Sequence, residues 1–177
     1  MESDYNTEEV DMKQLMKSDE STIVCADADR AEIVFEITRS TILGVYPKYY
    51  RSVEVSFFLK HHAIERILRD IADNKVYLCY DASGRAVGTV TICDNRICRL
   101  FVLPMCQGKG HGGALMQFAE DLIYQQYDCV LLDTSLPGKP MYLKRGYCVS
   151  EAASVTVDDG SQLHYEIMYK NRPADLI

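Results

Sequence analysis

The sequence has no excess of basic residues and no basic run. Its 177 residues include 19 Lys and Arg against 26 Asp and Glu, which gives a formal net charge of −7 and a pI near 5.1. Binding to nucleic-acid phosphates or to anionic lipids depends on clustered positive charge. We therefore expect neither a nucleic acid nor a membrane as the main partner.

Long apolar runs are also missing. No stretch approaches the roughly 20 apolar residues that span a bilayer. The first ten residues, MESDYNTEEV, have neither the basic region nor the apolar region of a secretory signal. These two absences predict a soluble cytoplasmic protein.

The sequence also has no recognisable cysteine motif. The seven cysteines are odd in number, they include no C-x-x-C, and most lie in apolar strand-like runs. The spacing of Cys93, Cys98 and Cys106 matches no zinc pattern. We expect reduced core thiols and no metal site, with the cysteines at Cys25, Cys79, Cys93, Cys98, Cys106, Cys129 and Cys148.

The chain does contain enough apolar residues to form one hydrophobic core. Apolar residues make up 47% of the chain, which at this length predicts a single domain. Residues 1–20 are acidic and polar, and we expect them to form an arm, at most a loose helix, outside the core. The domain then covers 21–170, and 171–177 form a short tail.

Apolar periodicity predicts an α/β order of elements along the domain. Gly44 and Pro47 are expected to end the first helix, and 53–73 is expected to form one continuous second helix. The buried strand 129–133 should lie parallel to 97–103. The predicted strands are 21–26, 75–80, 86–93, 97–103, 129–133, 147–157 and 162–170, and the helices are 28–43, 53–73, one after the glycines at 108–113, and 139–145.

The most informative segment is the glycine-rich stretch from Gln107 to Gly113 between a strand and a helix. Such a turn presents several backbone N–H groups at the positive end of a helix, which suits phosphate. Glycine permits close approach of the backbone to a pyrophosphate and also permits positive φ. The simpler alternative is a plain strand-to-helix connection.

A dinucleotide-binding unit is a further alternative. Gly108, Gly110 and Gly113 satisfy G-x-G-x-x-G, and Asp133 ends a strand about 20 residues later, as that fingerprint requires. Four residues nevertheless separate the preceding strand from the first glycine, and too little chain remains for a second half of that fold. A P-loop is excluded because Lys109 is followed by glycine and not by Ser or Thr.

At this point the sequence resembles the GCN5-related N-acetyltransferase (GNAT) superfamily. The segment 107–112 matches its signature loop of Arg or Gln, two residues, Gly, one residue, then Gly or Ala. The run Leu100–Pro104 is similar to the end of the strand before that loop, and Met141–Tyr147 is similar to the F-Y-x-x-x-G-F segment. The resemblance covers about 21–170 and implies a mixed, centrally splayed β-sheet flanked by helices.

The resemblance also implies the residues that bind acetyl-CoA. Backbone groups of Val102 and Leu103 would hold the pantetheine arm. Ser135 and Gly138 stand where the family often has Asn and Ala, so the pantetheine contacts there depart from the family pattern. The amides that would bind the pyrophosphate belong to Gln107, Gly108, Lys109, Gly110, His111 and Gly112. We also expect the His111 side chain to cap the loop or to contact phosphate.

The catalytic acid implied by the resemblance is Tyr142, whose alternative role is that of a core tyrosine. The family often carries a Glu base where this chain has Arg96 and Arg99, so no carboxylate base is predicted there. His61 and His62 are adjacent on a predicted helix, and one of them could face the acceptor.

The predicted activity is transfer of an acetyl group from acetyl-CoA directly to a primary amine within a ternary complex. The alternative is a catalytically silent module that binds acetyl-CoA as a sensor or scaffold. An aromatic set around 46–61 is compatible with a cationic or small aromatic amine, but the sequence does not identify the acceptor. The protein is expected to be a monomer or a homodimer.

Overall fold

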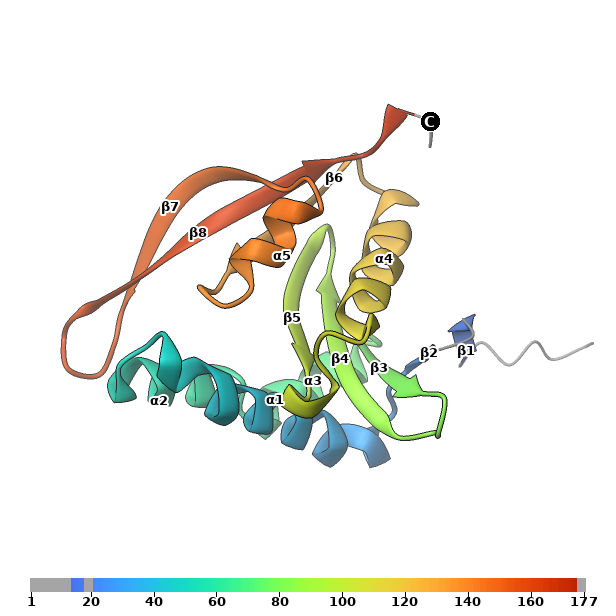
Figure 1. Cartoon of the computed structure of the whole chain (residues 1–177), viewed down its shortest axis with the longest axis horizontal. Helices are drawn as coiled ribbons and strands as arrows, with labels where there is room; N and C mark the ends of the chain where they lie inside the picture. The colour runs from blue at the N-terminus through green and yellow to red at the C-terminus, as the bar shows by residue number, and fades with distance from the viewer. Residues whose placement is uncertain (1–13, 18–20, 175–177) are drawn as a thin grey trace, which may run out of the picture.

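One mixed sheet with helices on both faces forms the protein (Figure 1). We describe a computed structural model, which covers residues 14–17 and 21–174. The sheet order is β1-β2-β3-β4-β5-β6-β8-β7, and every neighbouring pair is antiparallel except β5 and β6. The strands are β1 (Gln14–Lys17), β2 (Ser21–Cys25), β3 (Val76–Asp81), β4 (Ala86–Cys93), β5 (Arg96–Val102), β6 (Cys129–Thr134), β7 (Cys148–Thr156) and β8 (Gln162–Asn171).

The helices divide between the two faces of the sheet. In Figure 1, α1, α2 and α3 lie together at the bottom of the view, and α4 stands beside β4 and β5. The helices are α1 (Ala31–Val45), α2 (Ser52–His61), α3 (Ile64–Ala72), α4 (His111–Tyr124) and α5 (Lys139–Lys144), with short 3₁₀ turns η1 (Ala28–Arg30), η2 (Tyr46–Lys48) and η3 (Pro104–Cys106). No helix in this described part of the chain is both long enough and apolar enough to cross a bilayer.

Alternating side chains of the strands build two cores. Along β3, Val76 and Leu78 join the core that contains α1 and α3, whereas Tyr77 and Cys79 join the core that contains α4. This alternation follows from the two-residue period of a strand. The expected mixed sheet flanked by helices is confirmed, as are the parallel pair β5–β6 and the β7–β8 hairpin.

The parallel pair is short, and this shortness opens the centre of the sheet. Only Arg96 and Ile97 of β5 are in register with β6, opposite Leu131 and Leu132. The ladder between β4 and β5 shifts register in the same region, between Thr91 and Ile92. Such a bulge bends a strand and increases its twist. The remainder of β5 therefore diverges from β6, which is the central splay expected from the sequence.

One of the predicted helices is wrong. The segment 53–73 is broken into α2 and α3, because Ala63 is extended (ψ 156°) and His62 turns inward to pack on Phe101. The predicted end of the first helix is confirmed, since α1 ends at Val45, between Gly44 and Pro47. A Cβ at Gly44 would lie 3.0 Å from Pro104 Cγ, so this glycine permits a close approach of η3 to the helix.

Two further expectations need correction. Within the arm, Gln14–Lys17 forms a strand that pairs with β2 and is not helical; the rest of 1–20 lies outside the described residues. The seven cysteines are free thiols, as expected, but they are not all in the core. Cys79 and Cys106 are buried, whereas Cys148 is exposed at the start of β7.

A buried carboxylate ties α4 to the far side of the splay. Glu120 of α4 is 2% exposed and accepts hydrogen bonds from Arg145 Nη2 (2.9 Å), just after α5, and from Lys170 Nζ (2.9 Å) of β8. Burial alone would raise the pKa of Glu120, but these two cations hold the pKa below its usual value. The interaction therefore favours the folded state when Glu120 is ionised.

We predict that Glu120→Ala lowers the free energy of unfolding by about 3 kcal/mol, because two partly buried cations lose their partner. Urea denaturation measures the loss. Because the folded pKa is depressed, the difference should be full above the unfolded pKa of about 4.3 and should shrink as the pH falls through the folded pKa. Asp121→Ala, an exposed neighbour on α4, is the control and should change stability by less than about 0.5 kcal/mol. An equal loss in both variants would contradict this role of Glu120.

Candidate active site

The glycine loop has the backbone conformation that the sequence predicted. Gly108 has φ 75° and Gly110 has φ 90°, and Gly110 directly precedes α4. Side chains rarely adopt such angles, so glycine is required at both positions. No side chain caps α4, which leaves the N–H groups of its first turn directed towards the loop. The arrangement suits an anion.

The loop side chains differ in where they point. Gln107 Nε2 donates a hydrogen bond to the Val102 carbonyl (3.0 Å), and Lys109 is exposed. The His111 imidazole is buried, and its Nδ1 lies 3.0 Å from Ser21 Oγ of β2. The expectation that this side chain contacts phosphate is therefore wrong, because the ring faces into the fold. Only the backbone of His111 belongs to the loop.

A first cavity of about 270 Å³ extends from this loop into the splay between β5 and β6. It contains six of the predicted cofactor-binding residues and the predicted acid, Tyr142. The cavity is lined by Thr41, Val45, Tyr46, Leu100, Phe101, Val102, Gln107, Gly108, Gly112, Ser135, Pro137, Gly138, Met141 and Tyr142. The predicted residues Leu103, Lys109, Gly110 and His111 do not line it.

The alternation of hydrogen-bonded residues along the β4–β5 pair decides which backbone groups of β5 face this cavity. Leu103 N–H donates to the Val87 carbonyl (2.9 Å), and its own carbonyl accepts from Cys106 N–H (2.8 Å). Since bonding alternates along an antiparallel pair, Leu100 and Val102 direct their N–H and C=O groups away from β4, towards the splay. Of the two predicted residues, Val102 therefore directs its backbone groups towards the cavity and Leu103 does not, whereas Leu100, which was not predicted, does.

The turn between β6 and α5 depends on a small residue at Gly138. A Cβ at this position would lie 3.0 Å from Tyr142 Cε2 and 3.3 Å from Ser135 Oγ. Gly138 N–H donates to the Ser135 carbonyl (3.0 Å), which closes the turn. Gly138 thus lets the Tyr142 ring pack closely against the turn, where an alanine would collide with the ring.

Tyr142 stands on the wall of two cavities. Its side chain is 8% exposed, and burial raises the pKa of its hydroxyl to about 12. Within residues 14–17 and 21–174, no group hydrogen-bonds that hydroxyl. A phenol with a raised pKa keeps its proton at neutral pH and can donate it.

The second cavity has a volume of about 360 Å³ and lies beside the first. The two share Tyr46, Leu100, Phe101, Ser135 and Tyr142. The rest of its wall mixes aromatic and aliphatic side chains with polar and charged ones from α2, β5, β6 and the β7–β8 hairpin. These residues are Phe57, Phe58, His61, His62, Ile97, Cys98, Arg99, Asp133, Thr134, Val155, Leu163 and Tyr165.

The charged groups of the second cavity have partners within the protein. Arg99 Nη2 donates to Asp70 Oδ2 (3.0 Å), and its side chain is 2% exposed. Asp133 pairs with Arg96. The cavity therefore offers a wall without an unpaired charge among these residues. Asp133 was considered from the sequence only as part of a dinucleotide fingerprint.

Both predicted histidines face the second cavity, but they differ in environment. His62 is buried, and its Nδ1 lies 3.4 Å from Arg99 Nε. Burial, followed by the charge of Arg99, holds the pKa of His62 well below its usual value. One face of the His61 ring stacks on Phe57 and the rest is open to solvent; this partial burial, and then the charge of Arg66, lower the pKa of His61. Both imidazoles are accordingly neutral at neutral pH.

Two residues that sequence reasoning missed complete the first cavity. Thr41 Oγ1 of α1 donates to the Val102 carbonyl (3.1 Å), a contact that no sequence pattern indicates because α1 and β5 are far apart in the chain. Leu100 could have been found from the two-residue alternation along β5. Beside the cavity, the Tyr50 hydroxyl accepts a hydrogen bond from Leu136 N–H (2.7 Å) and joins the helical layer to the loop after β6.

Comparison with known proteins identifies the family. The family model described as Acetyltransferase (GNAT) domain matches residues 47–166, which is more than half of the chain. The chain belongs to the GNAT acetyltransferase family. The resemblance read from the sequence is confirmed, and family membership favours the acetyltransferase interpretation of the glycine loop over the dinucleotide alternative.

Solved structures share the fold of this GNAT chain. A GCN5-related N-acetyltransferase from Rhodopseudomonas palustris is 17% identical with a TM-score of 0.79, and the match covers 89% of this chain and 99% of that one. PaiA N-acetyltransferase from Thermoplasma acidophilum, solved in complex with coenzyme A, is 19% identical with a TM-score of 0.68, covering 86% and 99%. At these identities the likeness concerns the fold alone.

A curated relative is similar over part of its length. The UPF0157 protein YqkA of Bacillus subtilis (strain 168) is 27% identical over 150 residues, which are 80% of this chain and 43% of that protein. The chain therefore spans less than half the length of this relative.

We predict that Gly138→Ala lowers the free energy of unfolding by about 1–3 kcal/mol, because the added methyl overpacks the Tyr142 ring. Thermal or urea denaturation measures the effect. Gly113→Ala is the matched control, since a Cβ there meets nothing within 4 Å and α4 gains a better helix former. The control should stabilise the protein by about 0.5–1 kcal/mol. A neutral Gly138→Ala would mean that the turn relaxes without strain.

Proposed function

We propose that this GNAT protein is an N-acetyltransferase that moves an acetyl group from acetyl-CoA directly to a primary amine in a ternary complex. The observation that carries the proposal is the junction of the two cavities, where Tyr142 and Ser135 belong to both walls. Two substrates bound in adjoining cavities meet at such a junction. No covalent enzyme intermediate is then needed.

The first cavity is the proposed donor site. The amides of the glycine loop and the first turn of α4 would bind the pyrophosphate. The backbone groups of Leu100 and Val102 that face the splay would hydrogen-bond the amides of the pantetheine arm. Gln107 already donates to the Val102 carbonyl, and the Thr41 hydroxyl, which it shares with the Ile37 carbonyl (2.8 Å), lies 3.1 Å from it, so Leu100 has the greater free capacity. This orientation directs the thioester towards Tyr142.

The chemistry needs a neutral amine and a protonated leaving group. The amine nitrogen attacks the thioester carbonyl carbon, a C–N bond forms, and the C–S bond then breaks. Tyr142 would give its proton to the departing thiolate and regain one from solvent, while the amine proton leaves to solvent. Partial burial of the amine in the second cavity would assist, because burial disfavours the charged form of an amine.

A catalytically silent acetyl-CoA sensor is the alternative function. Such a module needs the first cavity only. The second cavity and the buried, unbonded Tyr142 hydroxyl at the junction favour the enzyme. Release of free coenzyme A thiol in the presence of an amine separates the two functions, since a sensor binds without turnover.

We predict that acetyl-CoA and coenzyme A stabilise the protein, by about 2.7 kcal/mol at 100 times the dissociation constant, whereas NAD does not. Thermal-shift titration tests this. Gly110→Val should abolish the shift, because the position needs φ 90° and the side chain would occupy the anion site. Gly84→Val imposes similar strain (φ 79°) in the distant β3–β4 turn and should retain binding. A shift with NAD alone would overturn the proposal.

We predict that Tyr142→Phe lowers kcat by about 100-fold, the low end for loss of a general acid, because a thiolate leaves readily with help from solvent. The dissociation constant for acetyl-CoA should stay unchanged, as for an interaction made mainly in the transition state. Tyr147→Phe, on a neighbouring ring 5.8 Å away that lines neither cavity, is the control. Full turnover by Tyr142→Phe with chemistry rate-limiting would make Tyr142 a packing residue.

A further inference from the structure

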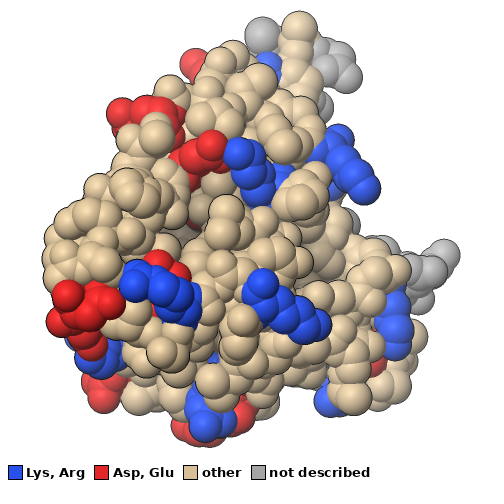
Figure 2. All heavy atoms as spheres, turned by 60° about the vertical axis from the view of Figure 1, so that its left-hand side comes forward, with Lys and Arg blue, Asp and Glu red and all other residues tan. Residues whose placement is uncertain are grey.

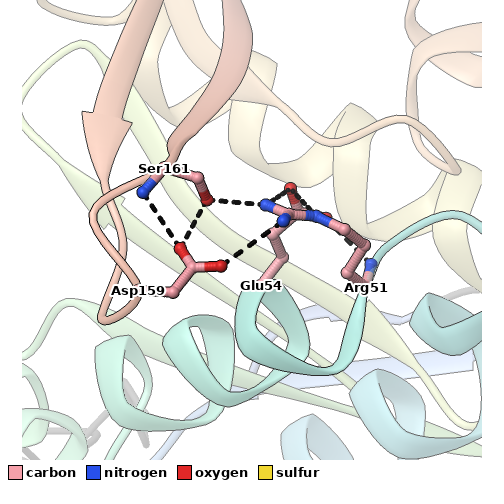
Figure 3. Close-up of polar contacts among 4 residues, drawn as sticks. All are labelled: Arg51, Glu54, Asp159 and Ser161. Carbon is pink, nitrogen blue, oxygen red and sulfur yellow. Dashed lines mark hydrogen bonds and ion pairs between the residues drawn. The ribbon is translucent and has the colours of Figure 1, made fainter.

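The tip of the β7–β8 hairpin touches α2 through paired charges. Arg51 Nη1 lies 3.4 Å from Asp159 Oδ2, and Arg51 Nη2 donates to Ser161 Oγ (2.7 Å), as Figure 3 shows. Lys60, one helix length away, pairs with Asp158. These contacts join segments about 100 residues apart in the sequence. We call this set the ionic latch: Arg51, Lys60, Asp158, Asp159 and Ser161.

Both sides of the ionic latch are held in place before they meet. Glu54 accepts a hydrogen bond from Arg51 N–H (2.8 Å) and another from its guanidinium (2.9 Å), which fixes Arg51 at the start of α2 (Figure 3). Asp159 Oδ1 accepts hydrogen bonds from Ser161 N–H (3.0 Å) and from Ser161 Oγ (2.6 Å). These bonds to Ser161 lower the pKa of Asp159. Little side-chain entropy remains to be lost when the two sides pair.

The second cavity lies between the two elements that the latch joins. Phe57, Phe58 and His61 of α2 form one wall, and Val155, Leu163 and Tyr165 of the hairpin form the facing wall. Contact at the hairpin tip therefore joins the outer ends of these two walls. An extended polypeptide advances about 3.3 Å per residue and needs an open groove to leave a site. The latch blocks such a path.

We propose that the ionic latch, by joining the two walls of this cavity, limits its acceptor to a small primary amine with an uncharged apolar or aromatic body and excludes a polypeptide. The inference rests on the proposed function. The volume of about 360 Å³ suits one small ligand. Arg99 and Asp133 are already paired inside the protein, so the wall offers no partner for a carboxylate on the substrate.

The outer surface agrees with a small substrate. Figure 2 brings this side of the molecule forward and shows acidic and basic side chains intermingled over its lower half, with no broad field of one sign. Recruitment of a charged macromolecule relies on a continuous patch of opposite charge. Selection is accordingly assigned to the cavity itself and to the latch that joins its two walls.

The experiment uses three matched acceptors that share one aromatic body: 2-phenylethylamine, phenylalanine, and the peptide Phe-Ala-Ala amide. Calorimetry measures their binding to the protein–coenzyme A complex, and thiol release from acetyl-CoA measures turnover. We expect 2-phenylethylamine to bind at least tenfold more tightly than either of the other two. The same order is expected in kcat/KM.

The variant Asp158→Asn/Asp159→Asn tests the latch. The asparagine carbonyl at 159 retains the bonds to Ser161, but both ion pairs are lost. The preference for the amine over the peptide should fall about fivefold, the size expected for two exposed ion pairs, and 0.5 M salt should do the same to the wild type. Asp81→Asn is the control, because Asp81 makes the same turn bonds to Ser83 N–H (2.9 Å) and Ser83 Oγ (2.6 Å) in the β3–β4 turn.

The outcomes separate this inference from the proposed function. Equal or tighter binding of the peptide, or a latch variant with unchanged selectivity, overturns the inference while acetyl transfer stands. If 2-phenylethylamine binds preferentially but none of the three acceptors is turned over, the enzymatic function is overturned. The preferential binding would still support a cavity selective for a small amine. Binding of none of the three overturns the inference as well.

Discussion

The early end of the β5–β6 ladder is the constraint on which the rest of the site depends. Two parallel strands that separate after Ile97 and Leu132 leave a row of backbone N–H and C=O groups inside the protein. Buried backbone groups need partners. The Val102 carbonyl finds them in Thr41 and Gln107, and a ligand with amide groups can satisfy others along the same edge. The splay is thus both the opening of the cavity and its binding surface.

A sheet that is open in its centre needs support from outside the ladder. Glu120 supplies it, because its carboxylate joins α4, on the β5 side of the splay, to Arg145 after α5 and to Lys170 of β8. On the opposite face of the sheet, the hydrogen bond between the Tyr50 hydroxyl and Leu136 N–H joins the segment before α2 to the loop after β6. Tyr142 lies in α5 between these two ties, which explains how a residue beyond the splay keeps a fixed position at the junction of the cavities.

The sequence predicts those features that depend on local chemistry. Alternating strands, the hairpin turn and the positive φ of Gly108 and Gly110 all follow from residue types at short spacing. Prediction from the sequence fails where a feature depends on contacts between residues far apart in the chain. Gly44 permits the close approach of Pro104, and the His111 side chain contacts Ser21 instead of the loop. Likewise, no local signal reveals that His62 leaves the helix to pack on Phe101. The glycine loop is therefore predictable, and so are aromatic residues around 46–61 that line the second cavity, but the inward turn of His62 is not.

The second cavity, which we propose as the acceptor site, has walls from α2 and from the β7–β8 hairpin. In the described part of the chain, two exposed ion pairs and the Arg51–Ser161 hydrogen bond join the outer ends of these walls. Exposed ion pairs contribute little to stability, about 0–1 kcal/mol each, and are screened by salt. An apolar contact of similar extent would bury the hairpin tip against α2 more firmly and hinder entry of the amine. In the function proposed above, a weak contact of this kind suits a site that must admit an amine, because separating the hairpin tip from α2 would cost little.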